Sequence, residues 1–173
     1  MRQEALEVLE TRRSIRSYTD QPVEAELLEA VLRAGTFAPT ARNRQDPIIV
    51  AVQDPDTCDI LRKLNAACWN EAVEDPYYGA PVILIVFAPD TFLGHLDAAS
   101  VQTNMLNAAH AVGLGGCWIN RPYEMFHTQE GKDLMAKWGV PANYIGVCSI
   151  SLGHIVGSCP EAKPRKEGYI IRV

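Results

Sequence analysis

Hydrophobic residues recur along the chain at two spacings, one typical of helices and one typical of strands. Residues 3–10 and 22–34 carry apolar side chains three and four positions apart, which predicts two amphipathic helices. Gly35 and Pro39 follow the second helix, where a left-handed glycine and a proline both favour a helix end. Three further helices are predicted, one opening at Asp54-Pro55-Asp56-Thr57, one over 97–112 and one over 128–138, closed by Gly139.

Continuous apolar runs between these helices predict the strands. Residues 48–52 and 82–88 are rich in β-branched side chains, which is typical of strands covered on both faces. Shorter strands are predicted over 117–119, after a glycine-rich turn, and over 145–152. Asp97 is expected near the start of its helix, where the helix dipole favours a carboxylate. Periodicity alone supports an alternating α/β pattern and leaves strand direction open.

The last 21 residues differ from the rest of the chain. Residues 153–168 contain prolines and a basic cluster of Lys163, Arg165 and Lys166, and an apolar segment, 169–173, follows. We expect this extension to leave the core and its last segment to add a strand to the sheet of a second copy, reciprocally. The pattern shows no internal repeat and predicts one domain over residues 1–173.

Composition narrows the class of protein. With 173 residues, 47% of them hydrophobic, the chain can bury a continuous core, and its net charge of -5 without a long basic run argues against nucleic-acid binding. The N-terminus lacks a secretory pattern and the apolar runs are too short for a bilayer, so we expect a cytoplasmic protein without membrane contact. Five cysteines without a CxxC pair predict packing roles, and the four histidines lack the spacing of a metal site, so no metal is expected.

The first candidate for chemistry is the basic segment Arg12-Arg13-Ser14-Ile15-Arg16 between the first two predicted helices. A solvated helix end is the more common explanation of such arginines. In an extended segment, however, Arg12, Ser14 and Arg16 would project from one face. Guanidinium donors match phosphate geometry, so this face is a candidate phosphate site.

The second candidate is the loop from Pro39 to Gln45, which includes Thr40, Ala41 and Asn43. Its small residues would let the backbone approach a flat ligand, and its amide side chains could bind one. Because such residues also form ordinary turns, the loop alone is a weak signal.

Together the two segments resemble the FMN-dependent nitroreductases, whose members share an Arg-Arg-Ser-x-Arg start and a Pro-Ser-x-x-Asn-x-Gln loop. Thr40 stands here in place of the loop serine. The similarity continues in the family's order, over essentially the whole chain, through Tyr78-Gly79-Ala80-Pro81, Gln102-Thr103-Asn104-Met105, Gly113-Leu114-Gly115-Gly116-Cys117-Trp118-Ile119 and Lys163-Pro164-Arg165.

This resemblance implies an α+β fold with a mixed, mostly antiparallel central sheet between helices, built as an intertwined homodimer with FMN at its interface. It assigns the FMN phosphate to Arg12, Arg13 and Ser14 with Lys163 and Arg165. Arg16 would approach the pyrimidine edge of the flavin, which a second contact from Asn65 or Asn70 would share if either reaches it. The implied ring contacts are Pro39, Thr40, Ala41 and Asn43 of the other subunit, and Trp118, Ile119 and Asn120.

The implied activity is ping-pong hydride transfer from NADH or NADPH to nitroaromatics, quinones or similar small electrophiles. The flavin carries the chemistry, so no catalytic side chain is assigned. Three alternatives stay open: a flavin-dependent dehalogenase or alkene reductase on the same scaffold, a non-catalytic FMN sensor or storage protein, and a scaffold without cofactor.

Overall fold

The computed structural model describes residues 2–173. In chain order its elements are α1 (Arg2–Thr11), α2 (Ala25–Thr36), the 3-10 turn η1 (Ala41–Asn43), β1 (Ile48–Val52), α3 (Pro55–Ala67), β2 (Val82–Pro89), α4 (Phe92–Ala111), β3 (Gly115–Ile119), α5 (Pro122–Met125), α6 (Gln129–Lys137) and β4 (Tyr144–Gly153). The predicted helices and the four predicted core strands are all present, whereas the last segment, 169–173, forms no strand in this chain, and α5 is an additional short helix. No helix within residues 2–173 has both the length and the apolar character needed to cross a bilayer.

The sheet has the order β1-β2-β4-β3, and each neighbouring pair is antiparallel. A single parallel bridge joins Ser14 to Gly116 at the outer edge of β3. The expected α+β fold with a mostly antiparallel sheet is therefore confirmed, with its parallel part confined to this bridge in the described chain. Strand direction came from the resemblance, since periodicity carries no such information.

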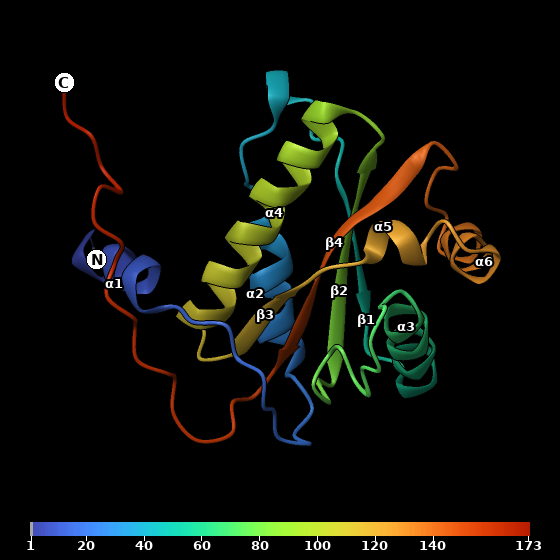
Figure 1. Ribbon diagram of the computed structural model, residues 1–173, viewed down its shortest axis with the longest axis horizontal. Helices are drawn as coiled ribbons and strands as arrows, with labels where there is room; N and C mark the ends of the chain where they lie inside the picture. The colour runs from blue at the N-terminus through green and yellow to red at the C-terminus, as the bar shows by residue number, and fades with distance from the viewer. Residues whose placement is uncertain (1) are drawn as a thin grey trace.

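Helices cover both faces of the sheet, as Figure 1 shows, with α2 and α4 on one side and α3, α5 and α6 on the other. Two hydrophobic clusters fill the two layers. Alternate residues of β2 belong to each cluster: Leu84 and Val86 face α4, whereas Ile85 and Phe87 face the α3 side. This explains why β2 reads as a continuous apolar run, because a strand covered on both faces has no polar face.

Two expectations about helix ends were wrong. Gly35 lies inside α2 and does not cap it, and a Cβ there would come within 2.9 Å of Ile49 and 2.8 Å of Met105. The glycine therefore permits close packing of α2 on α4. Asp97 does not lie at the start of α4, because that helix begins at Phe92 with Thr91 as its N-cap.

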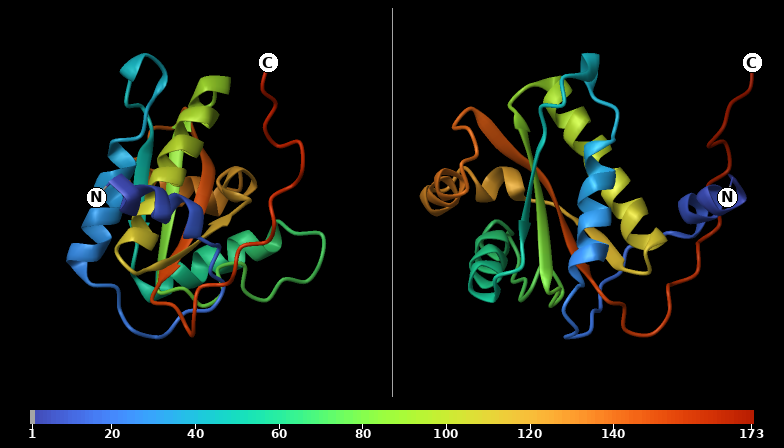
Figure 2. Two further views of the ribbon diagram at one scale, coloured as in Figure 1. Left: turned by 90° about the vertical axis from the view of Figure 1, so that its left-hand side faces the viewer. Right: turned by 180° about the vertical axis from the view of Figure 1, so that it is seen from behind.

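The C-terminal extension leaves the body of the molecule after β4 and runs outward (Figure 2). Its start is held by the bridge between Tyr18 and Ile155 and by the bond from the Val156 amide to the Ser17 carbonyl, 3.2 Å. Residues 160–173 are exposed, and the structure assigns them no helix or strand. The expected departure from the core is confirmed, whereas pairing with a second copy stays a prediction.

Candidate functional site

The basic segment is extended, as its alternation predicted, and lies along the edge of β3. The Ile15 amide donates to the Gly116 carbonyl at 3.1 Å, and the Ile15 side chain is only 4% exposed. It packs so tightly on Gly115 that an added Cβ there would meet Ile15 at 2.9 Å. Since neighbours in an extended segment point to opposite sides, Ser14 and Arg16 face away from Ile15.

Ser14, Arg12 and Arg16 all act on one neighbour, the thiol of Cys117 on β3. Burial raises the pKa of Cys117, while the two arginine charges and a hydrogen bond from Ser14 act in the opposite direction without outweighing it. The three side chains thus lie near the same residue of the edge strand. The convergence of these side chains on one ligand stays a prediction.

Arg13 behaves differently from its neighbours. Its guanidinium turns back and donates to the Glu10 carbonyl at 2.8 Å, and also to the carbonyl of Arg12. These bonds cap the carbonyl end of α1. Its Nε, however, is buried and has no hydrogen-bond partner among the described residues.

Arg16 lies beside the turn that precedes β2. Its guanidinium carbon is 5.9 Å from the centre of the Tyr78 ring, within the range of a cation–π contact. Tyr78 has a φ of 57°, a left-handed conformation that non-glycine residues adopt rarely. A turn in this conformation needs support from its surroundings.

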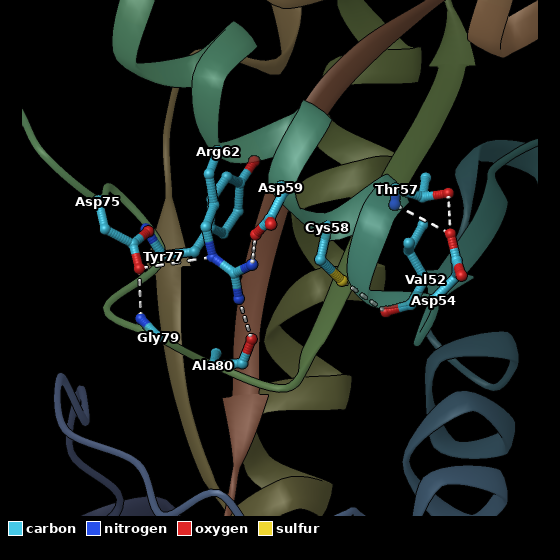
Figure 3. Close-up of polar contacts among 10 residues, drawn as sticks. All are labelled: Val52, Asp54, Thr57, Cys58, Asp59, Arg62, Asp75, Tyr77, Gly79 and Ala80. Carbon is cyan, nitrogen blue, oxygen red and sulfur yellow. Dashed lines mark hydrogen bonds and ion pairs between the residues drawn. The ribbon is translucent and has the colours of Figure 1, made fainter.

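Arg62 of α3 supplies that support, as Figure 3 shows. It donates to the Ala80 carbonyl at 2.7 Å and to Asp59 at 2.7 Å, and its Nε forms an ion pair with Asp75 at 3.4 Å. Asp75 in turn accepts from the amides of Tyr77 and Gly79. One arginine therefore fixes both ends of the turn that places Tyr78 next to Arg16.

The far end of β3 is held by a buried polar network that sequence reasoning did not find. Asn65 of α3 is 0% exposed and donates to the Asn120 carbonyl at 2.8 Å, while Ser149 donates to the Ile119 carbonyl at 3.1 Å. Tyr77 bonds to Ser149 at 3.1 Å, and burial raises its pKa to about 12. Asn65 interrupts the buried face of α3 and Ser149 lies in the buried strand β4, and such polar interruptions are the signal that could have revealed the network.

This network also distinguishes Asn65 from Asn70, the two asparagines proposed from the sequence as contacts of the pyrimidine edge. Besides Asn120, the side chain of Asn65 bonds to the Trp69 indole N–H at 2.9 Å, so its amide is committed to the core. Asn70 lies in an exposed segment after α3. A contact with an external ligand is therefore more compatible with Asn70. Trp118 is exposed, and its indole donates to the Asn120 side chain at 3.0 Å.

The predicted loop over 39–45 lies at the opposite end of α4 from the basic segment (Figure 1). The Ala41 amide donates to the Asp97 carboxylate at 2.9 Å, and the Gln45 amide donates to the Thr40 hydroxyl at 3.1 Å. The Asp97 carboxylate is therefore used to hold this loop. Arg42, Asn43 and Gln45 all have positive φ, and Pro39 and Asn43 are exposed.

The separation between the two motifs can be measured along α4. Asp97 contacts the loop, and His110, thirteen residues later, contacts Thr11 at 2.9 Å beside the basic segment. At 1.5 Å per residue, the two contacts are about 20 Å apart. One chain therefore does not bring the loop and the basic segment onto one small ligand.

The late basic pair lies on the exposed extension. Cys159 contacts the Thr11 carbonyl at 3.7 Å, which places the start of this segment beside the basic motif. Arg165 donates to the carbonyl of Lys163 at 3.1 Å. The structure records no contact of Lys163 or Arg165 with Arg12 or Ser14 among the described residues, so their convergence on one phosphate stays a prediction.

Two surface hollows lie away from the basic segment, although one of them adjoins the loop over 39–45. One of about 380 Å³ lies between α6 and the start of β4, against Phe126, Met135 and Tyr144. Another of about 200 Å³ adjoins Thr40 and Gln45. The basic segment lines neither hollow, and a ligand on its face would need a second wall to be enclosed.

The described histidines contact neighbouring polar groups, as His154 contacts Glu24 at 2.9 Å. Residues 2–173 contain no cluster of three or more potential metal ligands. Cys58, Cys117 and Cys148 are buried, whereas Cys68 and Cys159 are partly exposed. The packing role predicted for the cysteines fits the first three.

Comparison with known proteins identifies a family for this chain. The family model described as the nitroreductase family matches residues 9–154. A protein of Archaeoglobus fulgidus is 29% identical over 159 residues, which span 88% of this chain and 86% of that protein. Its provisional name is NADH dehydrogenase/NAD(P)H nitroreductase. The NADPH-flavin oxidoreductase of Vibrio harveyi is 27% identical over 96% of this chain and 71% of its own length. A nitroreductase from Bacteroides fragilis, solved with bound FMN, superposes with a TM-score of 0.90 at 27% identity over 98% of each chain.

We predict that Arg62→Gln destabilises the protein, because it leaves Asp75 and the Ala80 carbonyl without their guanidinium donor. The free energy of unfolding should fall by about 1–3 kcal/mol in urea denaturation, the usual range for a lost charge-assisted bond. Lys63→Gln alters the exposed neighbour on the same helix and should change it by less than about 0.5 kcal/mol. Equal effects of the two substitutions would contradict the role assigned to Arg62.

Proposed function

The chain belongs to the nitroreductase family, and on that premise we propose that it is an FMN-dependent oxidoreductase that uses NADH or NADPH to reduce small electrophilic acceptors such as nitroaromatics and quinones. The relatives support the coarse activity, since they include an NADPH-flavin oxidoreductase and an FMN reductase (NADPH), and a structural neighbour carries FMN. The acceptor class and the cytoplasmic location belong to the proposal.

The observation that carries this proposal is the division of the site between the two ends of α4. The basic segment and β3 form one open wall, and the loop over 39–45 lies about 20 Å away along the helix. In a two-fold dimer the loop of one subunit can cover the basic wall of the other. The exposed apolar side chains of Phe92 and Leu96 on α4, 78% and 52% exposed, give such a dimer a surface to bury.

The residues at the basic wall fit the phosphate of FMN. Arg12 and Ser14 offer donors on one face, and the buried Nε of Arg13 is a donor without a described acceptor. Charge-assisted bonds from such donors hold a phosphate strongly, so an acidic protein can bind this anion locally. We place Lys163 and Arg165 at the same phosphate, brought there by the extension.

At the other end of the wall, Arg16 would face the pyrimidine edge of the flavin, with Trp118, Ile119 and Asn120 beside the ring. A positive charge there stabilises the negative charge that reduction adds. Bound FMN would supply hydride transfer in two separate half-reactions, from the reduced nicotinamide to the flavin and from the flavin to the acceptor. The chain's own residues position the ring, and the partner's loop would exclude water from it.

The decisive experiment is the visible spectrum of the purified protein followed by a steady-state assay. We expect a yellow protein whose heat-released chromophore is FMN and whose flavin is bleached by NADH or NADPH and recovered by a nitro or quinone acceptor. Parallel double-reciprocal plots would support two separate half-reactions. A colourless protein that takes up no added FMN would overturn the proposal, and bound flavin that neither nicotinamide reduces would favour the sensor or storage alternative.

Arg12→Ala should weaken FMN retention. Loss of one charge-assisted phosphate contact, about 1.5–3 kcal/mol, corresponds to an increase of roughly tenfold to a hundredfold in the FMN dissociation constant. Flavin fluorescence during dialysis or titration measures this constant. Arg33→Ala, which removes an exposed arginine on α2, serves as the charge-matched control and should leave it unchanged. Full flavin content in the Arg12 variant would refute the phosphate assignment.

Deletion of residues 169–173 should impair dimerisation. These residues are exposed and pair with no strand of their own chain within the described structure, so the proposed dimer is where their apolar side chains would be buried. Sedimentation velocity should show a larger monomer fraction for the shortened chain at micromolar concentration. An unchanged dimer would show that the tail is not the intersubunit strand.

A further inference from the structure

Arg121 stands directly after Asn120, at the end of β3, and the proposed function gives it no task. Its backbone is left-handed, with φ 84° and ψ 1°. Glycine adopts this conformation without cost, whereas a long side chain is strained in it. Strained residues of this kind concentrate at binding sites, where the surrounding structure holds them in place.

The side chain of Arg121 is held on a prepared support. Its guanidinium carbon lies 4.9 Å from the centre of the Trp69 ring, and one terminal nitrogen pairs with Glu124 at 2.7 Å. Trp69 is itself fixed, because its indole N–H donates to the buried Asn65 at 2.9 Å. The same asparagine holds the Asn120 carbonyl at 2.8 Å, so one buried residue positions both the arginine's support and the strand end beside it.

The guanidinium is only partly satisfied by the chain. Glu124 engages Nη1, and Nε is buried and has no hydrogen-bond partner among the described residues. The side chain remains 35% exposed, so ligands from solvent can reach it. Arg121 is the N-cap of α5, and its carbonyl accepts from the Met125 amide at 3.0 Å. This backbone role requires no arginine side chain, and an exposed ion pair such as the one with Glu124 contributes little to stability.

We propose that Arg121 is a specificity-determining residue of the acceptor pocket, and that it selects electrophilic acceptors carrying a carboxylate. This inference rests on the proposed function, because it assumes that the flavin ring lies beside Trp118 and Asn120. A guanidinium fork matches the two oxygens of a carboxylate, and the exposed Trp69 offers an adjoining aromatic surface.

Glu124 has a defined part in this arrangement, since it competes with the acceptor for Arg121. The hydrogen bond and charge of Arg121 lower the pKa of Glu124 against the opposing effect of burial, so the carboxylate is ionised at neutral pH. The positive charge of Arg121 is already partly neutralised by Glu124. It therefore suits a single carboxylate better than the diphosphate of a nicotinamide dinucleotide. Phosphate recognition by Arg121 is therefore an alternative that the experiment has to separate.

The test uses the holoenzyme and a matched pair of acceptors, 4-nitrobenzoate and the neutral 4-nitrobenzamide. The protein is first reduced with NADH without oxygen and then mixed with each acceptor in a stopped-flow instrument. The ratio of the two second-order rate constants measures selectivity for the anion, independently of the nicotinamide. For the wild-type protein, this ratio should fall when salt is raised from about 0.1 M to about 1 M, where charges are screened within about 3 Å.

Arg121→Gln should lower this ratio about tenfold, as expected for a lost charge-assisted contact. Arg121→Gly should lower it equally and also relieves the backbone strain, so it keeps the test valid if the glutamine variant folds poorly. Glu124→Gln should raise the ratio several-fold, because it frees the guanidinium. Lys137→Gln, which removes an exposed charge from the end of α6, should keep the wild-type ratio.

An unchanged ratio in both Arg121 variants would overturn the inference. A second result would also overturn it: the ratio stays constant, but flavin reduction by NADPH becomes slower relative to reduction by NADH. That result would assign Arg121 to the nicotinamide phosphate. Failure of the proposed function looks different, since no flavin would be bound or no nicotinamide would reduce it in the wild-type protein.

Discussion

The arrangement of the site depends on the close contact between Ile15 and the glycine at the start of β3. Because Gly115 has no side chain, the segment over 12–16 can lie against the edge of the sheet, with the Ile15 amide bonded to Gly116. Burial of Ile15 then forces Ser14 and Arg16 to the opposite side. A larger residue at 115 would displace the whole basic segment, although it would touch none of the proposed cofactor contacts.

The other end of β3 is held by a different kind of force. There Asn65, Tyr77 and Ser149 form a buried polar network that binds the last carbonyls of the strand. Such a network is rigid when all its members are hydrogen-bonded. Breaking one bond would leave a polar group unpaired in a nonpolar interior, which costs much free energy. The strand is thus held by packing where the phosphate is proposed and by hydrogen bonds where the ring is proposed.

Much of this fold could be predicted from the sequence. Strands covered on both faces need continuous apolar runs, as at 48–52 and 82–88, and helices covered on one side need apolar residues at helical spacing, as in α2 and α6. The start of α4 could not, since Phe92 and Leu96 are exposed and break the pattern of a buried face. The extended form of residues 12–16 was predicted from alternation. The tasks of Asn65, Asp97 and Arg62 were not, because their partners lie 55, 56 and 18 residues away and no local pattern records them.

The placement of the two motifs at opposite ends of α4 has a consequence for mixed assemblies. In a symmetric dimer of the proposed kind, each complete site takes its basic wall from one chain and its loop from the other. Pairing a chain damaged at Arg12 with one damaged at Asn43 would leave one site wholly intact and concentrate both defects in the second. Each mixed dimer would then regain half of the activity of an intact dimer, which is interallelic complementation and an outcome that a site contained within a single chain cannot give.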